Sequence, residues 1–381
     1  MIYLDNAATS FPKPPTVARE VFKCMTEYCG NPGRGGHSLS LAAAKKVFEC
    51  RTEAAELIGC PDPENIVFTM NTTHALNLVI KGLLKPHDHV IISDMEHNSV
   101  FRPISLLAEK GLIEYSIFPT RTLDKNRNPS LICAGIARRM KANTRAVICS
   151  HASNVCSMSL PCEQIGAFCK KHGLYFIVDA AQSAGHLPID MEKMGIDALC
   201  APSHKALYGP QGAGFTALSK NIATELDTLL EGGSGVNSFD TLMPDTLPER
   251  FEAGTLPTPA ISGLCEGIKY IKKVGVDAIC DYEHELYRCA REYLLNIKGI
   301  TAYAPHHEGA VILFNKEGKT PEELASILNG HGICTRGGFH CSPLAHKTLG
   351  TDESGAVRIS FGIFNKKSEI DLLAKVLYDM K

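Results

Sequence analysis

The stretch Tyr175–Gly214, YFIVDAAQSAGHLPIDMEKMGIDALCAPSHKALYGPQGAG, decides the fold class of this chain. Two apolar runs, Tyr175–Ala180 and Ala198–Ser203, have the length and composition of buried strands in a parallel sheet. Asp179 stands at the end of the first run, and Lys205 follows the second. Ligands bind at the carboxyl ends of such strands. The segment therefore predicts an α/β fold with a ligand site that contains a carboxylate and an amine.

An amine and a carboxylate at this spacing are the two groups that a pyridoxal phosphate site needs. Lys205 can hold the cofactor aldehyde as a Schiff base, and Asp179 can pair with the pyridinium nitrogen and keep it protonated. Each residue alone also has an ordinary explanation, as a solvated lysine after a turn or as a helix N-cap. Their pairing on two strand ends favours the cofactor site, and with it chemistry on an amino acid.

The composition is that of a globular protein long enough for two domains. The chain has 381 residues, of which 44% are hydrophobic and 21% are charged, and a net charge of -2. We expect no nucleic-acid partner from this balance, no membrane span, and no signal peptide in MIYLDNAATS. The 15 cysteines are scattered without zinc-type pairs, which predicts thiols in a reducing cytoplasm and no metal site.

The domain organisation follows from a change in texture near Thr258. Before it, strands and helices alternate, which indicates a mostly parallel sheet covered on both faces. After it, long helices and a few strands indicate a smaller α+β domain. We expect a large domain over residues 16–258, and a small domain formed by residues 1–15 and 259–381. The other expected strands are Ile66–Thr69, His89–Ser93, Arg145–His151, Gly214–Leu218, Ala310–Phe314 and Val357–Phe361.

Further polar residues follow the predicted strand ends. Asn71, Thr72 and Thr73 precede a helix and could bind a phosphate at its N-terminus, or merely cap it. Ser203 and His204 could add two more donors.

Two more side chains stand just after strands. His97 could stack on the cofactor ring and move protons, or be an ordinary loop histidine. Asn154 could hydrogen-bond the ring oxygen or the substrate.

The second informative segment is Cys334–Gly350, CTRGGFHCSPLAHKTLG. Cys341 lies in a polar, glycine-rich stretch, beside His340 and five residues after Arg336. Cationic neighbours favour the thiolate and therefore reactivity, although Cys341 could also be one more spare thiol. Arg358, inside a strand-like run, needs an anion partner. That partner could be a substrate α-carboxylate or a local acidic side chain.

The order of these motifs resembles one family, the NifS-like cysteine desulfurases and selenocysteine lyases among the fold-type I, class V pyridoxal phosphate enzymes. The pattern R-x-G-x-H-C at Arg336–Cys341 resembles the one found in the Suf-type branch of this family. The sequence departs from that pattern at Asn71, His74 and Phe339, where Gly, Glu and His are more usual. The resemblance implies a mostly parallel seven-stranded sheet. It rests on YLDNAAT, NPGRGGHSLS, NTTHALN, EHNS, HASNVCS, VDAAQSAGH, SHKALYGPQGAG, RFEAGTLPT, RGGFHC and VRIS.

For the cofactor, the resemblance implies a role at each strand end. Lys205 would carry the cofactor, Asp179 would pair with its ring nitrogen, and Gln182 would pair with the ring hydroxyl. His97 would stack on the ring. The remaining cofactor-binding set would be Asn71, Thr72, Thr73, Asn154, Ser203, His204 and Thr255.

For the substrate, the resemblance implies L-cysteine, with Cys341 as the nucleophile that becomes a persulfide. Thr255 would reach the phosphate in the partner subunit's site, so a homodimer with shared active sites is expected. A sulfur-acceptor protein is a further expected partner. The substrate-binding residues would be Arg34, His37, Asn154, Arg336 and Arg358.

Several alternatives remain open at the level of sequence. A selenocysteine lyase would need no cysteine nucleophile, and neither would another class V enzyme such as an aminotransferase. A scaffold that only docks sulfur-transfer partners is a fourth reading, which activity on free cysteine would exclude.

Overall fold

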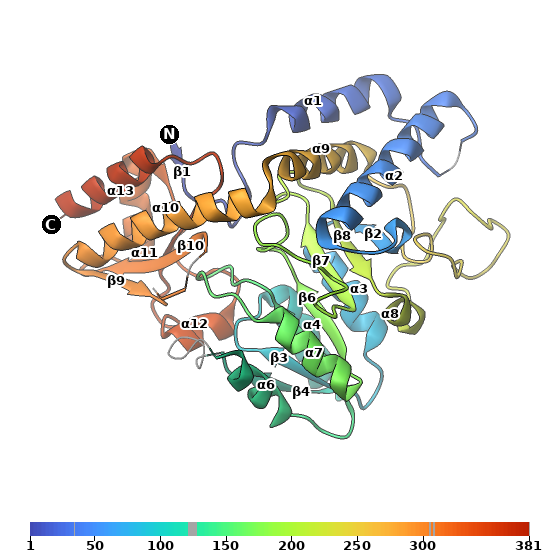
Figure 1. The fold of residues 1–381 in the computed structure, drawn as a ribbon, viewed down its shortest axis with the longest axis horizontal. Coiled ribbons are helices and arrows are strands. Elements are labelled where there is room, and N and C mark those ends of the chain that lie inside the picture. Colours follow the sequence, from blue (N-terminus) through green and yellow to red (C-terminus); the bar gives the residue numbers. More distant parts are fainter. Residues whose placement is uncertain (34, 121–127, 305, 308, 381) are drawn as a thin grey trace.

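A computed structural model describes residues 1–33, 35–120, 128–304, 306–307 and 309–380. The chain forms a larger part around a seven-stranded sheet and a smaller part around a three-stranded sheet (Figure 1). Both termini lie in the smaller part, so the chain begins there, builds the larger part and returns. No helix among the described residues has the length and apolar character needed to cross a membrane.

The large sheet is mostly parallel, as expected, and its strand order is β2-β8-β7-β6-β5-β3-β4. Neighbouring strands from β4 to β7 run parallel, whereas β8 is antiparallel to both of its neighbours. Strand β4 lies on one side of β3, whereas β5, β6 and β7 follow one another on its other side. At such a reversal of strand order, the carboxyl ends of the neighbouring strands border a crevice. The strands are β2 (Ile66–Thr69), β3 (His89–Ser93), β4 (Glu114–Phe118), β5 (Thr144–Ser150), β6 (Tyr175–Asp179), β7 (Ala198–Pro202) and β8 (Gly214–Leu218).

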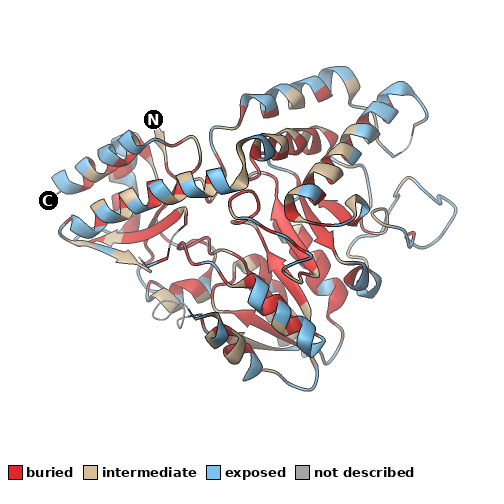
Figure 2. Cartoon of the chain, viewed as in Figure 1, coloured by how far each residue is buried: buried red, intermediate tan, exposed pale blue. Residues whose placement is uncertain are grey.

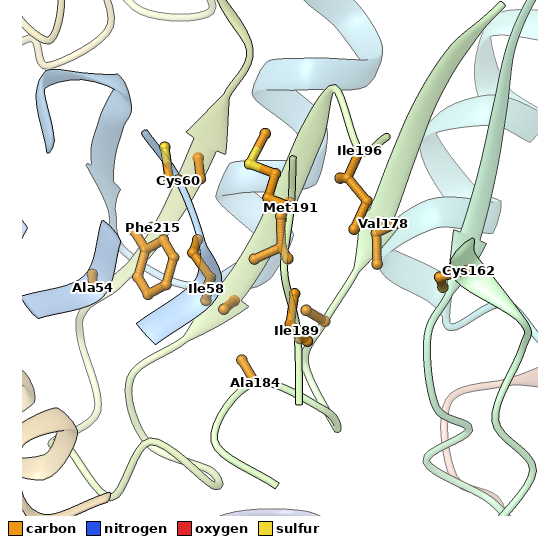
Figure 3. Close-up of a cluster of buried hydrophobic side chains, with 14 of the residues drawn as sticks. Ala54, Ile58, Cys60, Cys162, Val178, Ala184, Ile189, Met191, Ile196 and Phe215 are labelled. Atoms are coloured by element: carbon orange, nitrogen blue, oxygen red, sulfur yellow. The ribbon is translucent and has the colours of Figure 1, made fainter. Parts of the chain in front are cut away.

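Apolar side chains cover both faces of this sheet, and Figure 2 shows its strands as buried. In β6, Phe176 and Val178 belong to the hydrophobic cluster on one face, and Ile177 belongs to the cluster on the other. Figure 3 shows part of the first cluster, where Phe215 of the sheet lies beside Ile58 of a covering helix and Val178 lies beside Ile196. This two-sided burial explains the near-continuous apolar runs of the sequence.

Helices pack on both faces of the large sheet. The helical side chains of the first cluster come from α2, α6, α7, α9 and the first turn of α10 (Val276–Asn296), and those of the second come from α3, α4 and α8. A π-helical turn, Cys24–Tyr28, follows α1, and a 3-10 turn, Pro63–Asn65, precedes β2. The helices are α1 (Pro15–Lys23), α2 (Ser38–Ile58), α3 (Thr72–Leu83), α4 (Asn98–Glu109), α6 (Pro129–Ala137), α7 (Cys162–His172), α8 (Lys220–Glu225) and α9 (Thr258–Val274).

The smaller part is built around an antiparallel sheet of order β12-β10-β9. The N-terminal β1 (Ile2–Tyr3) pairs in parallel with β11 (Ile333–Cys334), and these two strands form a separate small sheet. The remaining elements are β9 (Ile300–Tyr303), β10 (Val311–Lys316), β12 (Val357–Ser360), α10 (Val276–Asn296), α11 (Pro321–Gly330), α12 (Pro343–Leu349) and α13 (Lys367–Asp379).

The proposed domain boundary at residue 258 falls at the start of α9. This helix contributes Ile261, Leu264 and Ile268 to the core of the large sheet. The division into a large domain of residues 16–258 and a small domain of residues 1–15 and 259–381 stays a prediction. Because α9 packs on the large sheet, we propose that the large domain extends through α9 to Gly275.

Helix α7 approaches the loop before β7 so closely that Gly166 has no room for a side chain. A Cβ atom added there would lie 1.8 Å from the Met194 carbonyl oxygen, whereas one added at Gly135 of α6 meets only Phe118, at 4.0 Å. Gly166→Ala should lower the free energy of unfolding by about 3 kcal/mol, because the backbone must shift. Gly135→Ala, the matched control, should raise it by about 0.5–1 kcal/mol. Urea unfolding measures both, and equal effects would contradict this packing.

Candidate active site

A cavity of about 350 Å³ opens at the carboxyl edge of the large sheet, where the two parts of the chain meet. Residues from β6, from the β7–β8 connection, from α3 and α4, and from the C-terminal part all reach its wall. Of the residues predicted from sequence, the wall contains Asn71, Thr72, Thr73, His97, Asn154, Asp179, Gln182, His204, Lys205, Arg336, Cys341 and Arg358.

Three further predicted residues lie outside this wall. Ser203 is fully buried directly beside the wall. His37 is exposed and caps α2, where its Nδ1 accepts a hydrogen bond from the Ser40 amide at 3.3 Å. Thr255 is exposed and accepts a bond from the Asn31 amide group at 3.3 Å. Arg34 lies outside the described residues.

Lys205 and Asp179 form the buried charged centre of the cavity. Burial lowers the pKa of Lys205 to about 8, against the opposing attraction of Asp179. Burial also raises the pKa of Asp179, while the Ala181 amide, 2.9 Å from Oδ1, and the Lys205 ammonium oppose that rise. A lysine with this pKa is partly neutral near neutral pH, as a nucleophilic amine or a general base must be.

His97 is held in one orientation at the start of α4. Its Nδ1 accepts a hydrogen bond from the Ser99 amide at 3.1 Å, so a neutral ring carries its proton on Nε2. Burial, and then the positive charges of Lys205 and Arg336, lower its pKa to about 4. The imidazole on the cavity wall is therefore neutral at physiological pH.

The N-terminus of α3 has the features of a phosphate site. Three buried polar atoms lack hydrogen-bond partners among the described residues: Thr72 Oγ1 at this terminus, and Ser203 Oγ and His204 Nδ1 in the two residues before Lys205. Asn71 caps the helix by accepting a bond from the His74 amide at 2.9 Å. Unsatisfied buried donors are costly, so a group must complete them. A phosphate at a helix N-terminus fits this requirement.

The N-terminal segment holds the backbone of Lys205 in place, a contact that sequence reasoning missed. Ser10 Oγ donates to the Lys205 carbonyl at 2.8 Å, and Lys13 Nζ donates to the His204 carbonyl at 2.7 Å. The Gln182 side chain donates to the Ala7 carbonyl at 3.0 Å. Nothing in the local sequence indicates these bonds, because they join residues 175 to 195 positions apart.

Arg358 is buried and forms an ion pair with an acidic side chain of the protein, one of the two possibilities that the sequence left open. Its Nη2 lies 2.6 Å from Asp5 Oδ1, and its Nη1 donates to the Asn154 carbonyl at 3.0 Å. Its Nε is buried without a partner among the described residues. A contact with a substrate carboxylate remains a prediction.

Cys341 is exposed and lies on the cavity wall. Arg336 Nη2 is 3.9 Å from its sulfur. Burial and Arg358 lower the pKa of the adjacent His340 to about 3, so His340 is neutral. Of the two cationic neighbours expected from sequence, Arg336 is therefore the one that carries charge beside the thiol.

Glu96 is a buried acid that sequence reasoning also missed, although it directly precedes His97. One carboxylate oxygen accepts from the Ser150 amide at 3.0 Å, and the other accepts from Ser150 Oγ at 3.1 Å. Ser150 pairs in register with Asp179. Burial raises the pKa of Glu96 to about 8, and the bonds from Ser93 and Ser150 oppose the rise. Because Glu96 is protonated near neutral pH, it adds no second negative charge beside Asp179.

This fold and this cavity place the chain in a known family. A model of the class V aminotransferases matches residues 2–373, so the chain belongs to that family and has the fold-type I architecture of pyridoxal phosphate enzymes. Within it, the chain is similar to cysteine desulfurases. A probable cysteine desulfurase of Methanothermobacter thermautotrophicus is 34% identical over 385 residues, which cover 100% of this chain and 94% of the relative.

Solved structures agree with this relationship. The apo structure of a cysteine desulfurase from Thermococcus onnurineus NA1 has a TM-score of 0.90 and 32% identity, covering 100% of this chain and 94% of that one. The cysteine desulfurase CsdA from Escherichia coli has a TM-score of 0.86 and 25% identity, covering 98% and 93%.

The raised pKa of Glu96 predicts a pH dependence of stability. The folded protein binds the Glu96 proton more tightly than the unfolded chain does. The stability linked to Glu96 is therefore full below pH 4.5 and is lost as the pH rises towards 8. Relative to Glu96→Gln, the wild type should lose on the order of a few kcal/mol across this window.

Unfolding free energies at several pH values measure this difference. Glu109→Gln, at an exposed position of α4, is the control and should leave the pH dependence unchanged. A constant difference between wild type and Glu96→Gln from pH 5 to pH 8 would refute the buried, protonated carboxyl.

Proposed function

We propose that the protein is a cysteine desulfurase that uses pyridoxal 5'-phosphate to convert L-cysteine to L-alanine and retains the sulfur as a persulfide on Cys341. The observation that carries this proposal is the presence of Cys341 on the same cavity wall as Lys205 and Asp179. When bound, the cofactor supplies an electron sink for the amino-acid Cα. Other class V chemistry does not require a cysteine at this position.

The cofactor is supported by how the residues fit it. Lys205 offers an amine of lowered pKa, and Asp179 offers a buried carboxylate to a ring nitrogen. The phosphate would be bound by Thr72 and His204, which both line the cavity, and by Ser203, which directly precedes His204; each has a buried polar atom without a partner among the described residues. Gln182 and His97 remain the proposed contacts of the ring.

The chain's own residues perform two tasks in the proposed reaction. Neutral Lys205 takes the Cα proton and returns a proton to the substrate, and its lowered pKa suits both directions of transfer. The Cys341 thiolate attacks the substrate sulfur. The new S–S bond forms as the C–S bond breaks, and the carbon gains a proton to become alanine. Cysteine and the Cys341 thiol thus yield alanine and a persulfide, with no other reactant.

Substrate binding is proposed to rest on the arginines of the cavity. Arg336 and Arg358 bring two positive charges to the wall, which favours an α-carboxylate. Asn154, Arg34 and His37 remain proposed contacts on the strength of the resemblance. His37 lies outside the cavity of its own chain, so any contact to a substrate requires a rearranged loop or a partner subunit.

A homodimer with shared active sites is supported by apolar exposure. Figure 1 places α1, α2 and the loop before α9 on one side of the molecule. These segments expose large apolar side chains that a monomer in water would bury. Thr255 lies on the same side, outside its own cavity. The exposed residues are Phe22, Met25, Leu39, Leu41, Phe48, Phe239 and Leu242.

A sulfur-acceptor protein is supported by a second hollow on the outer side of Cys341. A groove of about 470 Å³ runs between α4 and the segment before α12, and Cys341 lines both this groove and the inner cavity. Its rim exposes Leu106 and Phe339. The persulfide would pass to an acceptor thiol by exchange. The short segment Arg336–Cys341 supports the proposed Suf-type branch, and the cysteines, all thiols, support a reducing cytoplasm.

Replacing the nucleophile tests this function. Cys341→Ser should lower alanine formation from L-cysteine on the order of 100-fold or more, because a hydroxyl cannot form the persulfide. Bound cofactor should stay at the wild-type level. Cys334→Ser, seven residues earlier in β11, is the matched control and should keep the wild-type rate.

The same assay includes L-selenocysteine, which separates the main alternative. Alanine from L-cysteine at the wild-type rate in Cys341→Ser would overturn the nucleophile. Alanine from selenocysteine alone, undiminished in the variant, would make the protein a selenocysteine lyase.

A further inference from the structure

Cys341 occupies an unusual backbone conformation. Its φ is +58°, in the left-handed region that L-residues other than Asn and Asp rarely adopt. Such a conformation costs on the order of 1–3 kcal/mol and persists only where the surroundings hold it. The segment His340–Ser342 must therefore be fixed by contacts with the rest of the molecule.

Those contacts come from two asparagines of the large sheet's carboxyl edge. Asn154 Nδ2 donates to the His340 carbonyl at 2.6 Å, and Asn154 Oδ1 accepts from Ser342 Oγ at 2.7 Å. The backbone N–H of Asn98, the first residue of α4, donates to the Cys341 carbonyl at 2.8 Å. One carboxamide thus binds the residue before the cysteine and the residue after it.

The Asn154 carboxamide and the two residues that it binds are buried, and the backbone of Asn154 is held by a further hydrogen bond. Asn154, His340 and Ser342 are all buried. The Asn154 carbonyl accepts from Arg358 Nη1 at 3.0 Å, which fixes the backbone from which the carboxamide projects. Hydrogen bonds without competing water determine a conformation more strictly than exposed ones do.

We propose that Asn154 is a positioning residue for the nucleophile, whose carboxamide clasps the backbone on both sides of Cys341 and holds its sulfur at the wall between the inner cavity and the outer groove. The inference rests on the proposed function and adds a role beyond contact with cofactor or substrate. Because the backbone is tied on both sides, the sulfur moves between the two hollows by side-chain rotation alone.

Ser342 is the sharper probe of this clasp. Its hydroxyl makes one of the two side-chain bonds, and Ser342 lines the outer groove without lining the inner cavity. Ser342→Ala removes the bond and leaves the cavity wall intact. Ser342→Thr keeps the hydroxyl. Ser262→Ala is the matched control, since Ser262 is equally buried and donates to the Thr258 carbonyl of its own helix at 2.8 Å.

The first readout is the kinetics of holoenzyme with L-cysteine. Ser342→Ala should lower kcat for alanine roughly tenfold, with KM unchanged, because losing one buried hydrogen bond misplaces the sulfur without touching the substrate site. Ser342→Thr should restore kcat, and Ser262→Ala should match the wild type. Wild-type kcat in Ser342→Ala, or an equal loss in Ser262→Ala, would overturn the proposal.

The second readout does not depend on turnover. Iodoacetamide alkylation of Cys341, followed by peptide mass mapping, reports how tightly the segment is held, with exposed Cys29 as the reference thiol. The rate at Cys341 relative to Cys29 should rise severalfold in Ser342→Ala, and an unchanged ratio would overturn the clasp. If the wild type makes no alanine while Ser342→Ala still shows this rise, the proposed function is refuted and the positioning role of Asn154 stands.

Asn154→Asp provides a second variant should Ser342→Ala fail to fold. It removes the donor to the His340 carbonyl and keeps an oxygen for Ser342. The alkylation ratio should again rise severalfold, and an unchanged ratio would overturn the proposal.

Discussion

The burial of one lysine amine beside one carboxylate is the constraint on which the site depends. The parallel sheet, covered on both faces, excludes water from the carboxyl ends of β6 and β7, so Lys205 and Asp179 lose hydration together. Loss of hydration lowers the pKa of the amine and raises the pKa of the acid. The architecture of the sheet thereby produces a reactive amine without any special local sequence.

The rest of the chain brings separate segments to that centre. The N-terminal residues cross from the small sheet to bind the carbonyls of His204 and Lys205, and the C-terminal segment brings Cys341 and Arg358 to the same cavity. Arg358 then joins these arms, since it binds Asp5 and Asn154. The two ends of the chain must therefore meet before the site is complete.

Sequence reasoning identified the site residues that follow predicted strands and missed the hydrogen bonds between residues far apart in the sequence. The apolar runs predicted β2, β3 and β8 with their observed bounds. Strand β4 escaped notice because it lies at the sheet edge, half exposed and without a clear apolar run. Lys205 and Asp179 follow strands and were found. The bonds of Asn154 to the Cys341 segment could not be predicted, because nothing local indicates which backbone groups a carboxamide will meet.

The central claim is that sulfur moves from the substrate to Cys341. The most direct test is peptide mass spectrometry of the holoenzyme under non-reducing conditions, after one equivalent of L-cysteine. The account predicts one additional sulfur atom on the peptide that contains Cys341, together with one equivalent of alanine. Alanine accompanied by free sulfide with Cys341 unmodified, or sulfur on another of the 15 cysteines, would contradict it.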